Sequence, residues 1–202
     1  MGFRSGHPFY LECIHEYKEP VHIKGFLNPE ECDYLIKLAK PNLKNSEVGS
    51  GDVNKTIRDS MSSYIPGSDR IGRKLRLKCS TYCNIPLSNF ETLQVTYYKP
   101  GGYYDFHQDA WAETPNRRKV TFIVALNDGD EYEGGETIFP VLDKKFKFQK
   151  GDALFFYATT GKHNYISDMA LHGGAPIISG EKWICNQFIQ ESPVYGEERY
   201  FF

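Results

Sequence analysis

From residue 92 onward, the apolar side chains follow a period of two, in short runs separated by turn-forming residues. Leu93, Val95 and Tyr97 alternate with more polar neighbours and precede a Pro-Gly-Gly turn at 100–102. This alternation predicts a half-buried strand. Further strands are expected at 120–126, 146–148, 153–157 and 183–189. Because no helical pattern separates these runs, we expect a sandwich or barrel, and within that class a double-stranded β-helix, or jelly roll.

The first part of the chain carries helix signals instead. Asn28 can cap a helix that has Pro29 in its first turn and Glu31 placed as in a capping box. Apolar residues then recur at helical spacing up to Pro41. A second helix is expected over about 69–82, with the following side chains facing inward: Ile71, Leu75, Cys79 and Tyr82.

These patterns predict an α+β protein that is mainly β, with a jelly-roll core and supporting N-terminal helices. No repeat, low-complexity tract or long linker divides the chain. We therefore expect a single domain over 1–202, in which 1–90 form a helical support and 91–190 form the jelly-roll core.

The charge balance argues against a nucleic-acid partner. The chain has 24 basic and 26 acidic residues, a net charge of -2, whereas general nucleic-acid binders are basic. The basic residues of the second expected helix would resemble a binding patch in isolation, but a solvated helix face is the favoured interpretation. These residues are Arg70, Arg73, Lys74, Arg76 and Lys78.

The sequence shows no membrane segment. Its longest apolar run, 122–126, is far shorter than the roughly 20 residues that span a bilayer. No signal peptide opens the chain, so we expect a cytoplasmic protein with no membrane partner. Among the five cysteines, Cys79 and Cys83 lie one helical turn apart and leave a pairing open. Buried, reduced thiols are the favoured interpretation.

His107 and Asp109 follow the Gly-rich turn after the first core strand. In an extended segment, residues i and i+2 point the same way, so this imidazole and carboxylate can bind one metal ion from one side. The third ligand should come from a distant strand, and His163 and His172 are both candidates. Two imidazoles and one carboxylate form the facial triad of non-heme Fe(II) oxygenases.

Lys182 lies at the start of an apolar strand, ten residues after His172. A lysine that faces a core is costly unless it meets an anion, and a dicarboxylate cosubstrate would supply one. The alternative is a surface lysine whose ammonium group reaches solvent.

Taken together, residues 91–190 resemble the catalytic core of 2-oxoglutarate- and Fe(II)-dependent prolyl 4-hydroxylases. The helix from Asn28 is also similar to the opening of that family, so the resemblance covers roughly 21–190. No upstream peptide-binding domain is recognised, which fits the small soluble viral, bacterial and algal members. The matching stretches, in the order of the family, are 93–95, 98–109, 126–128, 134–140, 150–156, 171–177 and 180–183.

The resemblance implies the site. The expected Fe(II) ligands are His107, Asp109 and His172, and with Lys182 they form the expected catalytic set. The distal carboxylate of 2-oxoglutarate would be bound by Lys182, Tyr104 and Thr137, while Trp183 would shape the pocket near the metal. The resemblance also implies that 2-oxoglutarate and O₂ are cosubstrates and that L-ascorbate keeps the iron reduced. Taken alone, Tyr104 could equally be an ordinary strand aromatic.

The implied activity is that of a peptidyl-proline 4-dioxygenase, which hydroxylates proline-rich or collagen-like peptides and converts 2-oxoglutarate to succinate and CO₂. Two alternatives remain open from the sequence. One is a 2-oxoglutarate-dependent hydroxylase of another side chain or a small molecule, and the other is a non-catalytic jelly-roll binding module. A monomer or small homo-oligomer is expected.

The resemblance also implies peptide contacts. Arg58 and Ser60 match an Arg-x-Ser element on a lid, and Arg118 matches a basic position near the peptide groove; polar surface loops are the alternative for both segments. Because polyproline II helices dock on aromatic surfaces, tyrosines are expected to contribute as well. The candidates are Tyr64, Tyr103 and Tyr132.

Overall fold

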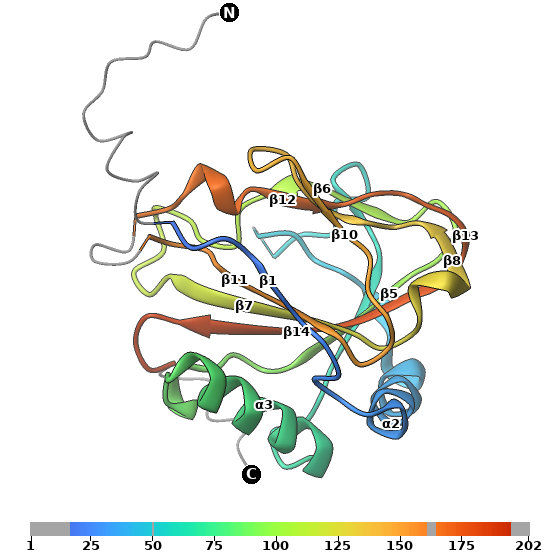
Figure 1. The fold of residues 1–202 in the computed structure, drawn as a ribbon, viewed down its shortest axis with the longest axis horizontal. Helices are drawn as coiled ribbons and strands as arrows, with labels where there is room; N and C mark the ends of the chain where they lie inside the picture. Colours follow the sequence, from blue (N-terminus) through green and yellow to red (C-terminus); the bar gives the residue numbers. More distant parts are fainter. Residues whose placement is uncertain (1–16, 50, 161–164, 195–202) are drawn as a thin grey trace, which may run out of the picture.

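The computed structural model describes residues 17–49, 51–160 and 165–194, and two antiparallel sheets face each other in it (Figure 1). The larger sheet has the strand order β1 (Val21–Ile23), β11 (Ala153–Tyr157), β7 (Arg118–Ala125), β14 (Lys182–Gln190), β5 (Gln94–Tyr98), β4 (Met61–Tyr64) and β2 (Lys44–Asn45). The smaller sheet has the order β10 (Lys144–Phe146), β9 (Thr137–Phe139), β12 (His172–Gly174), β6 (Tyr103–His107) and β3 (Arg58–Asp59). A separate pair is formed by β13 (Ile177–Gly180) and β8 (Tyr132–Gly134). The predicted jelly roll is confirmed.

Two helices, α2 (Pro29–Ala39) and α3 (Arg70–Cys83), cover the face of the larger sheet that points away from the smaller one (Figure 1). Both begin where the sequence predicts. The Asn28 side chain accepts from the backbone N–H of Glu31 and the Glu31 carboxylate accepts from that of Asn28, a complete capping box. Asp69 caps α3 by accepting from Gly72 N at 2.7 Å.

A hydrophobic core fills the space between these helices and the larger sheet. It contains Leu35 of α2, Leu75 of α3 and Phe122 of β7, all fully buried. Tyr82 packs toward the sheet as predicted, although 46% of it stays exposed in the last turn of α3. Its ring makes edge-type contacts with two core residues, Phe122 at a centroid distance of 5.9 Å and Phe155 at 5.0 Å.

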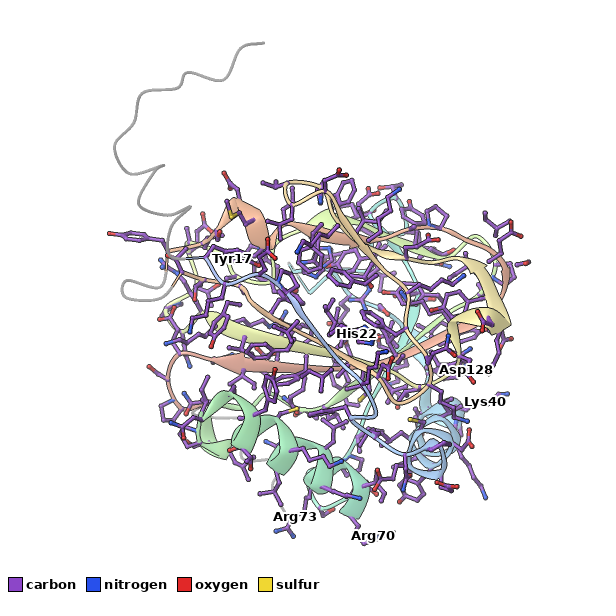
Figure 2. The ribbon with its side chains drawn as sticks, viewed as in Figure 1. Tyr17, His22, Lys40, Arg70, Arg73 and Asp128 are labelled. Carbon is purple, nitrogen blue, oxygen red and sulfur yellow. The ribbon has the colours of Figure 1, made fainter. Side chains whose placement is uncertain are left out.

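The basic side chains of α3 are divided between solvent and core. Arg70 and Arg73 extend away from the sheet (Figure 2), in agreement with the expected solvated face. Arg76 is buried instead, and its guanidinium donates to Phe90 O at 3.3 Å. A nucleic-acid patch along this helix would therefore lack its central member.

The cysteines of the described residues are free thiols. Cys32, Cys79 and Cys185 are buried, as expected, and Cys83 is half-buried; Cys13 lies outside the described residues. Burial raises the pKa of the Cys32 thiol to about 12, so this thiol is inert at neutral pH. In the part of the chain that the structure describes, no helix is long and apolar enough to cross a membrane.

The segment before residue 91 is less helical than expected. It contributes β1, β2 and β4 to the larger sheet and β3 to the smaller one. These strands span two to four residues, which is too short for a period of two to be recognised. His22 of β1 (Figure 2) also contacts the turn before β11, with Nε2 2.7 Å from Asp152 Oδ2.

The strand β5 is buried on both faces, not half-buried as predicted. Val95 faces the helices, while Gln94 and Thr96 face the space between the two sheets and are buried there. One end of that space is filled by a second core around Leu154, Phe139 and other apolar side chains. The rest forms a cavity.

Candidate active site

The cavity lies between the two sheets and has a volume of about 270 Å³. The strands β4, β5, β7 and β14 of the larger sheet line one side, and β3, β6, β9 and β12 of the smaller sheet line the other. The wall is completed by Glu47, Val48, Gly49, Gly51 and Trp111. Candidate residues from distant parts of the sequence thus meet in one enclosed space, as a sandwich allows.

Three side chains of the types that can bind a metal ion converge in this cavity. His107 ends β6 and pairs in register with His172, which begins β12, and Asp109 follows two residues after His107. One Asp109 oxygen lies 3.7 Å from His107 Nε2 and the other lies 3.8 Å from His172 Nε2. One ligand atom from each residue falls within 4.8 Å of the others. The structure brings the predicted three together, while the alternative candidate His163 lies outside the described residues.

Backbone contacts orient both imidazoles. His107 Nδ1 lies 2.8 Å from Asp105 O, and His172 Nδ1 lies 2.9 Å from Ala170 O. A carbonyl only accepts, so each Nδ1 carries a proton and each Nε2 is the ring nitrogen that faces the cluster. Burial, followed by the proximity of His172, lowers the pKa of His107 to about 3. A neutral imidazole is the form that binds metals.

Asp109 is fully enclosed and charged. Burial alone would raise its pKa, but His172, His107 and Arg118 outweigh this effect and hold the pKa below its usual value. Thr121 of β7 donates a 2.6 Å hydrogen bond to Asp109 Oδ2. The carboxylate is thereby fixed from the opposite sheet.

Lys182 is a buried cation in the same cavity. Its ammonium donates to Gly135 O at 2.7 Å, and none of the described carboxylates forms an ion pair with it. Burial lowers its pKa to about 8. Tyr104 and Thr137 line the same cavity. A buried ammonium without a counter-ion is costly, so this position favours the binding of an anion.

Tyr104 connects the metal-type cluster with a buried arginine. Its ring stacks on the His107 imidazole with centroids 3.6 Å apart, and the Arg58 guanidinium lies 4.6 Å from the ring centroid. Arg58 also donates to Ser60 Oγ at 2.8 Å and to Glu47 O at 3.1 Å. Arg58 therefore lines the cavity on β3, which pairs with β6, and Ser60 is buried beside it; neither residue lies on an exposed lid.

Arg118 also lines the cavity, where it is neutralised. Its Nε and Nη2 each lie 2.7 Å from a carboxylate oxygen of Glu91, a bidentate pair, and its guanidinium lies 3.6 Å from the ring centroid of Phe188. Burial opposes the charge, but Glu91 raises the pKa of Arg118 above its usual value.

Trp183 does not shape the metal pocket, contrary to the prediction. Successive residues of a strand alternate between faces, so Lys182 and Ile184 face the cavity while Trp183 faces the helices. There its ring packs on Tyr97 at a centroid distance of 4.6 Å.

The three tyrosines expected at a peptide surface have different environments. Tyr64 is 59% exposed and lines the cavity. Tyr103 lies outside the cavity lining and donates to Lys55 O at 3.1 Å. Tyr132 is buried in the second core, so it cannot contact a peptide. Of the three, only Tyr64 borders the cavity.

Sequence reasoning missed several cavity residues. Gln94, Asn186 and Thr121 line the cavity from the larger sheet, and Trp111 lines it after Asp109. The first three are polar residues at alternate positions of otherwise apolar strands. That pattern normally indicates a solvent face, and here it marks the wall of an internal cavity instead.

The donor set fits Fe(II). Two imidazole Nε2 atoms and one carboxylate, all oriented by hydrogen bonds to their surroundings, match the ligands of a 2-His-1-carboxylate iron site. The jelly roll, this cluster and the buried lysine together define the 2-oxoglutarate- and Fe(II)-dependent oxygenase class. In agreement, residues 93–190 match the model of the 2OG-Fe(II) oxygenase superfamily.

Relatives specify the family within this class. A protein of Acanthamoeba polyphaga mimivirus, provisionally named a prolyl 4-hydroxylase, is 34% identical over 192 residues, which cover 90% of this chain and 78% of that protein. Prolyl 4-hydroxylase 1 of Arabidopsis thaliana is 31% identical over 195 residues, covering 84% of this chain and 68% of that protein. The chain belongs to the prolyl 4-hydroxylase family.

A solved structure shows the same relationship. The viral collagen prolyl hydroxylase of Paramecium Bursaria Chlorella virus-1, solved as a 2-oxoglutarate complex, has 32% identity and a TM-score of 0.73, over 87% of this chain and 97% of that one. A prolyl-4-hydroxylase of Pseudomonas putida has a TM-score of 0.63 over 91% of this chain and 98% of that one. Its identity is 18%, so it supports the fold alone.

Proposed function

We propose that the chain is a peptidyl-proline 4-dioxygenase. It would hydroxylate prolyl residues of proline-rich or collagen-like peptides and couple this reaction to oxidative decarboxylation of 2-oxoglutarate to succinate and CO₂. The observation that carries the proposal is the placement of Lys182, a buried cation with no ion-pair partner among the described carboxylates, in the same cavity as His107, Asp109 and His172. The names of the relatives support the prolyl substrate.

The proposed ligands of Fe(II) are His107, Asp109 and His172. When bound, Fe(II) and 2-oxoglutarate would supply the oxidation by O₂, a chemistry that protein side chains lack. The protein contributes the orientation of the three ligands. The hydrogen bonds to Asp105 O and Ala170 O hold the imidazoles in the required tautomer.

The proposed partner of the distal carboxylate of 2-oxoglutarate is Lys182, because a charge-assisted hydrogen bond would offset the cost of burying its ammonium. Thr137 and Tyr104 are proposed as hydroxyl donors to the same carboxylate. Burial raises the pKa of Tyr104, so its phenol remains a donor at neutral pH. The Tyr104 ring also keeps one face of His107 covered and out of water.

The proposed peptide contacts are Arg58, Ser60, Tyr64 and Arg118. Prolines lack an N–H, so a proline-rich chain presents mainly carbonyl acceptors, and donors of this kind suit it. Arg58 would act from the cavity wall, and Ser60, which accepts a hydrogen bond from Arg58, would act beside it. Trp183 is not included, because it faces the helices.

Three further parts of the proposal rest on the family resemblance and the sequence. L-ascorbate is proposed as the reductant that maintains Fe(II). Without ascorbate, the reaction should stop earlier, although its initial rate should be unchanged. A monomer or small homo-oligomer is proposed, which size-exclusion chromatography with light scattering measures. A cytoplasmic location is proposed, and fractionation of the source cells tests it.

The decisive experiment measures succinate and peptide mass together. The protein is incubated with Fe(II), 2-oxoglutarate, ascorbate and a panel of proline-rich, collagen-like and proline-free peptides. A gain of one oxygen on proline, matched by succinate, is expected, and His172→Ala should abolish both. His22→Ala serves as the matched control, because His22 lies outside the cavity. Unchanged turnover in His172→Ala, or oxidation of the proline-free peptides alone, contradicts the proposal.

A further inference from the structure

A row of three side chains crosses the larger sheet opposite the metal-type cluster. Tyr64 of β4 pairs in register with Gln94 of β5, which in turn pairs with Asn186 of β14. All three line the cavity that contains His107, Asp109 and His172. Directly opposed residues of neighbouring strands have side chains in contact range on one face, so the row extends continuously from the sheet interior to the cavity mouth.

Hydrogen bonds run along this row. The Asn186 amide donates to Gln94 Oε1 at 3.4 Å and to Thr96 Oγ1 at 3.2 Å. The Gln94 amide donates to Tyr64 Oη at 3.3 Å. Since the Tyr64 oxygen accepts from Gln94, its own proton points elsewhere, and no described residue accepts it. The row thus ends in an oriented hydroxyl donor.

The exposure of the three residues changes sharply along the row. Gln94 and Asn186 are 7% exposed, whereas Tyr64 is 59% exposed. Two buried carboxamides are costly unless hydrogen-bonded. Here they are hydrogen-bonded to each other, and Gln94 is also hydrogen-bonded to the exposed Tyr64. An apolar pair would pack at least as well, so packing alone does not explain the amides.

The row is separate from the lysine end of the cavity. Lys182 lies four residues before Asn186 on β14, which corresponds to roughly 13 Å along a strand. A carboxylate that contacts Lys182 is therefore remote from the row, which leaves Tyr64 available to a different molecule. The chemistry that suits an exposed aromatic ring with a free donor is a prolyl segment, whose rings are apolar and whose carbonyls lack local N–H partners.

We propose that Tyr64 is a specificity-determining residue for the peptide, donating from its hydroxyl to a main-chain carbonyl near the target proline. Gln94 and Asn186 are positioning residues that hold the phenol in this orientation. The inference rests on the proposed prolyl hydroxylation and adds to it a defined subsite on the larger sheet.

The test uses two nearly isosteric variants of the full chain. Tyr64→Phe removes the donor. Gln94→Glu replaces the amide that donates to Tyr64 with a carboxylate that can only accept, so the phenol turns inward and is lost to the peptide. Each should raise the KM for a proline-rich peptide about 5- to 10-fold, the loss expected for one hydrogen bond. The kcat and the KM for 2-oxoglutarate should not change.

The matched control is Tyr103→Phe, which removes a hydroxyl that bonds Lys55 O outside the cavity. It should leave the peptide KM unchanged. The double variant Tyr64→Phe with Gln94→Glu should be no worse than either single variant, because both remove the same donor. Thermal unfolding of every variant verifies that the fold is intact.

The outcomes separate this inference from the proposed function. The Kd of the peptide is measured by calorimetry with Mn(II) and 2-oxoglutarate, so it needs no turnover. A wild-type protein that binds the peptide without hydroxylating it contradicts the proposed function, and the Tyr64 comparison is then made on Kd. Equal peptide affinity of Tyr64→Phe and the wild type overturns the subsite, and a wild type that binds no prolyl peptide overturns both. Additive losses in the double variant overturn the role of Gln94.

Discussion

The hydroxyl of Thr121 donates a 2.6 Å hydrogen bond to Asp109 Oδ2, and this contact connects the larger sheet to the metal-type cluster. Asp109 follows β6, so its carboxylate would otherwise be oriented by a loop alone. The bond fixes the carboxylate between the two imidazoles. Thr121 therefore belongs to the outer shell that keeps the expected metal ligands in place.

Replacement of Thr121 should weaken metal binding. Thr121→Val keeps the shape of the side chain and removes the donor, so the Asp109 carboxylate loses one fixed contact. We expect Mn(II) or Fe(II) affinity to fall by about 10-fold, as measured by calorimetric titration. Thr56→Val, in an exposed turn where Thr56 bonds only to Asn54, is the control. An affinity loss in both variants would rule out a specific role.

Lys182 should prove functional and not structural. Lys182→Met removes the charge but retains most of the buried aliphatic stem, so 2-oxoglutarate affinity should fall by about 100-fold. Because Lys182 is a buried cation without an ion-pair partner among the described carboxylates, the variant should be at least as stable as the wild type. Calorimetry and thermal unfolding measure the two effects. A destabilised variant with intact cosubstrate binding would refute the assignment.

The affinity for 2-oxoglutarate should decline at alkaline pH. Burial lowers the pKa of Lys182 to about 8. Below that pH the free protein carries the ammonium that a dicarboxylate needs. Above it, Lys182 is a neutral amine that must take up a proton when 2-oxoglutarate binds. The Kd should therefore be level below about pH 8 and rise by up to about 10-fold per pH unit above it. Lys182→Arg is the control, since arginine keeps its charge and its Kd should be independent of pH from 7 to 10.

Lys182 should also affect how the free energy of unfolding depends on pH. Because the folded-state pKa of Lys182 is depressed, the unfolded chain binds more protons than the folded one between about pH 8 and the ordinary lysine pKa. The contribution of Lys182 to the free energy of unfolding should therefore increase as pH rises through this window. Urea unfolding of the wild type and of Lys182→Met at several pH values isolates this contribution by difference.

Glu91 should be required for stability through Arg118. Glu91→Gln removes one half of a partly exposed bidentate pair and leaves the Arg118 guanidinium without a countercharge. Allowing for solvent screening, we expect a loss of about 1–2 kcal/mol in the free energy of unfolding. Chemical denaturation measures this loss. Glu133→Gln, at an exposed strand position, should leave stability unchanged.

The sequence could predict the helices because their signals are local. Asn28 and Asp69 cap α2 and α3 with contacts to residues only three positions away. The strand β3, by contrast, spans two residues and is defined by its pairing with β6, in which Arg58 pairs with Tyr104 and Asp59 with Tyr103. Such pairing is not visible in a local pattern.

For the site, spacing alone could place His107 and Asp109 on one side of a strand, but it could not distinguish His163 from His172. The choice came from the family resemblance, and the structure places His172 opposite His107. The prediction for Trp183 is wrong because adjacent residues of a strand face opposite sides of the sheet. Lys182 faces the cavity, so Trp183 faces the helices. Gln94 was missed because a polar residue in a strand gives no sign of whether it faces solvent or an internal cavity.

The short N-terminal strands determine how far this enzyme can be trimmed. A fragment limited to the matched segment 93–190 would remove β1, β3 and β4, which pair with β11, β6 and β5. Three interior strands would then become free edges with unpaired N–H and C=O groups, and edges of that kind recruit other chains. We expect such a fragment to self-associate, so the minimal protein for engineering or display must begin before Val21.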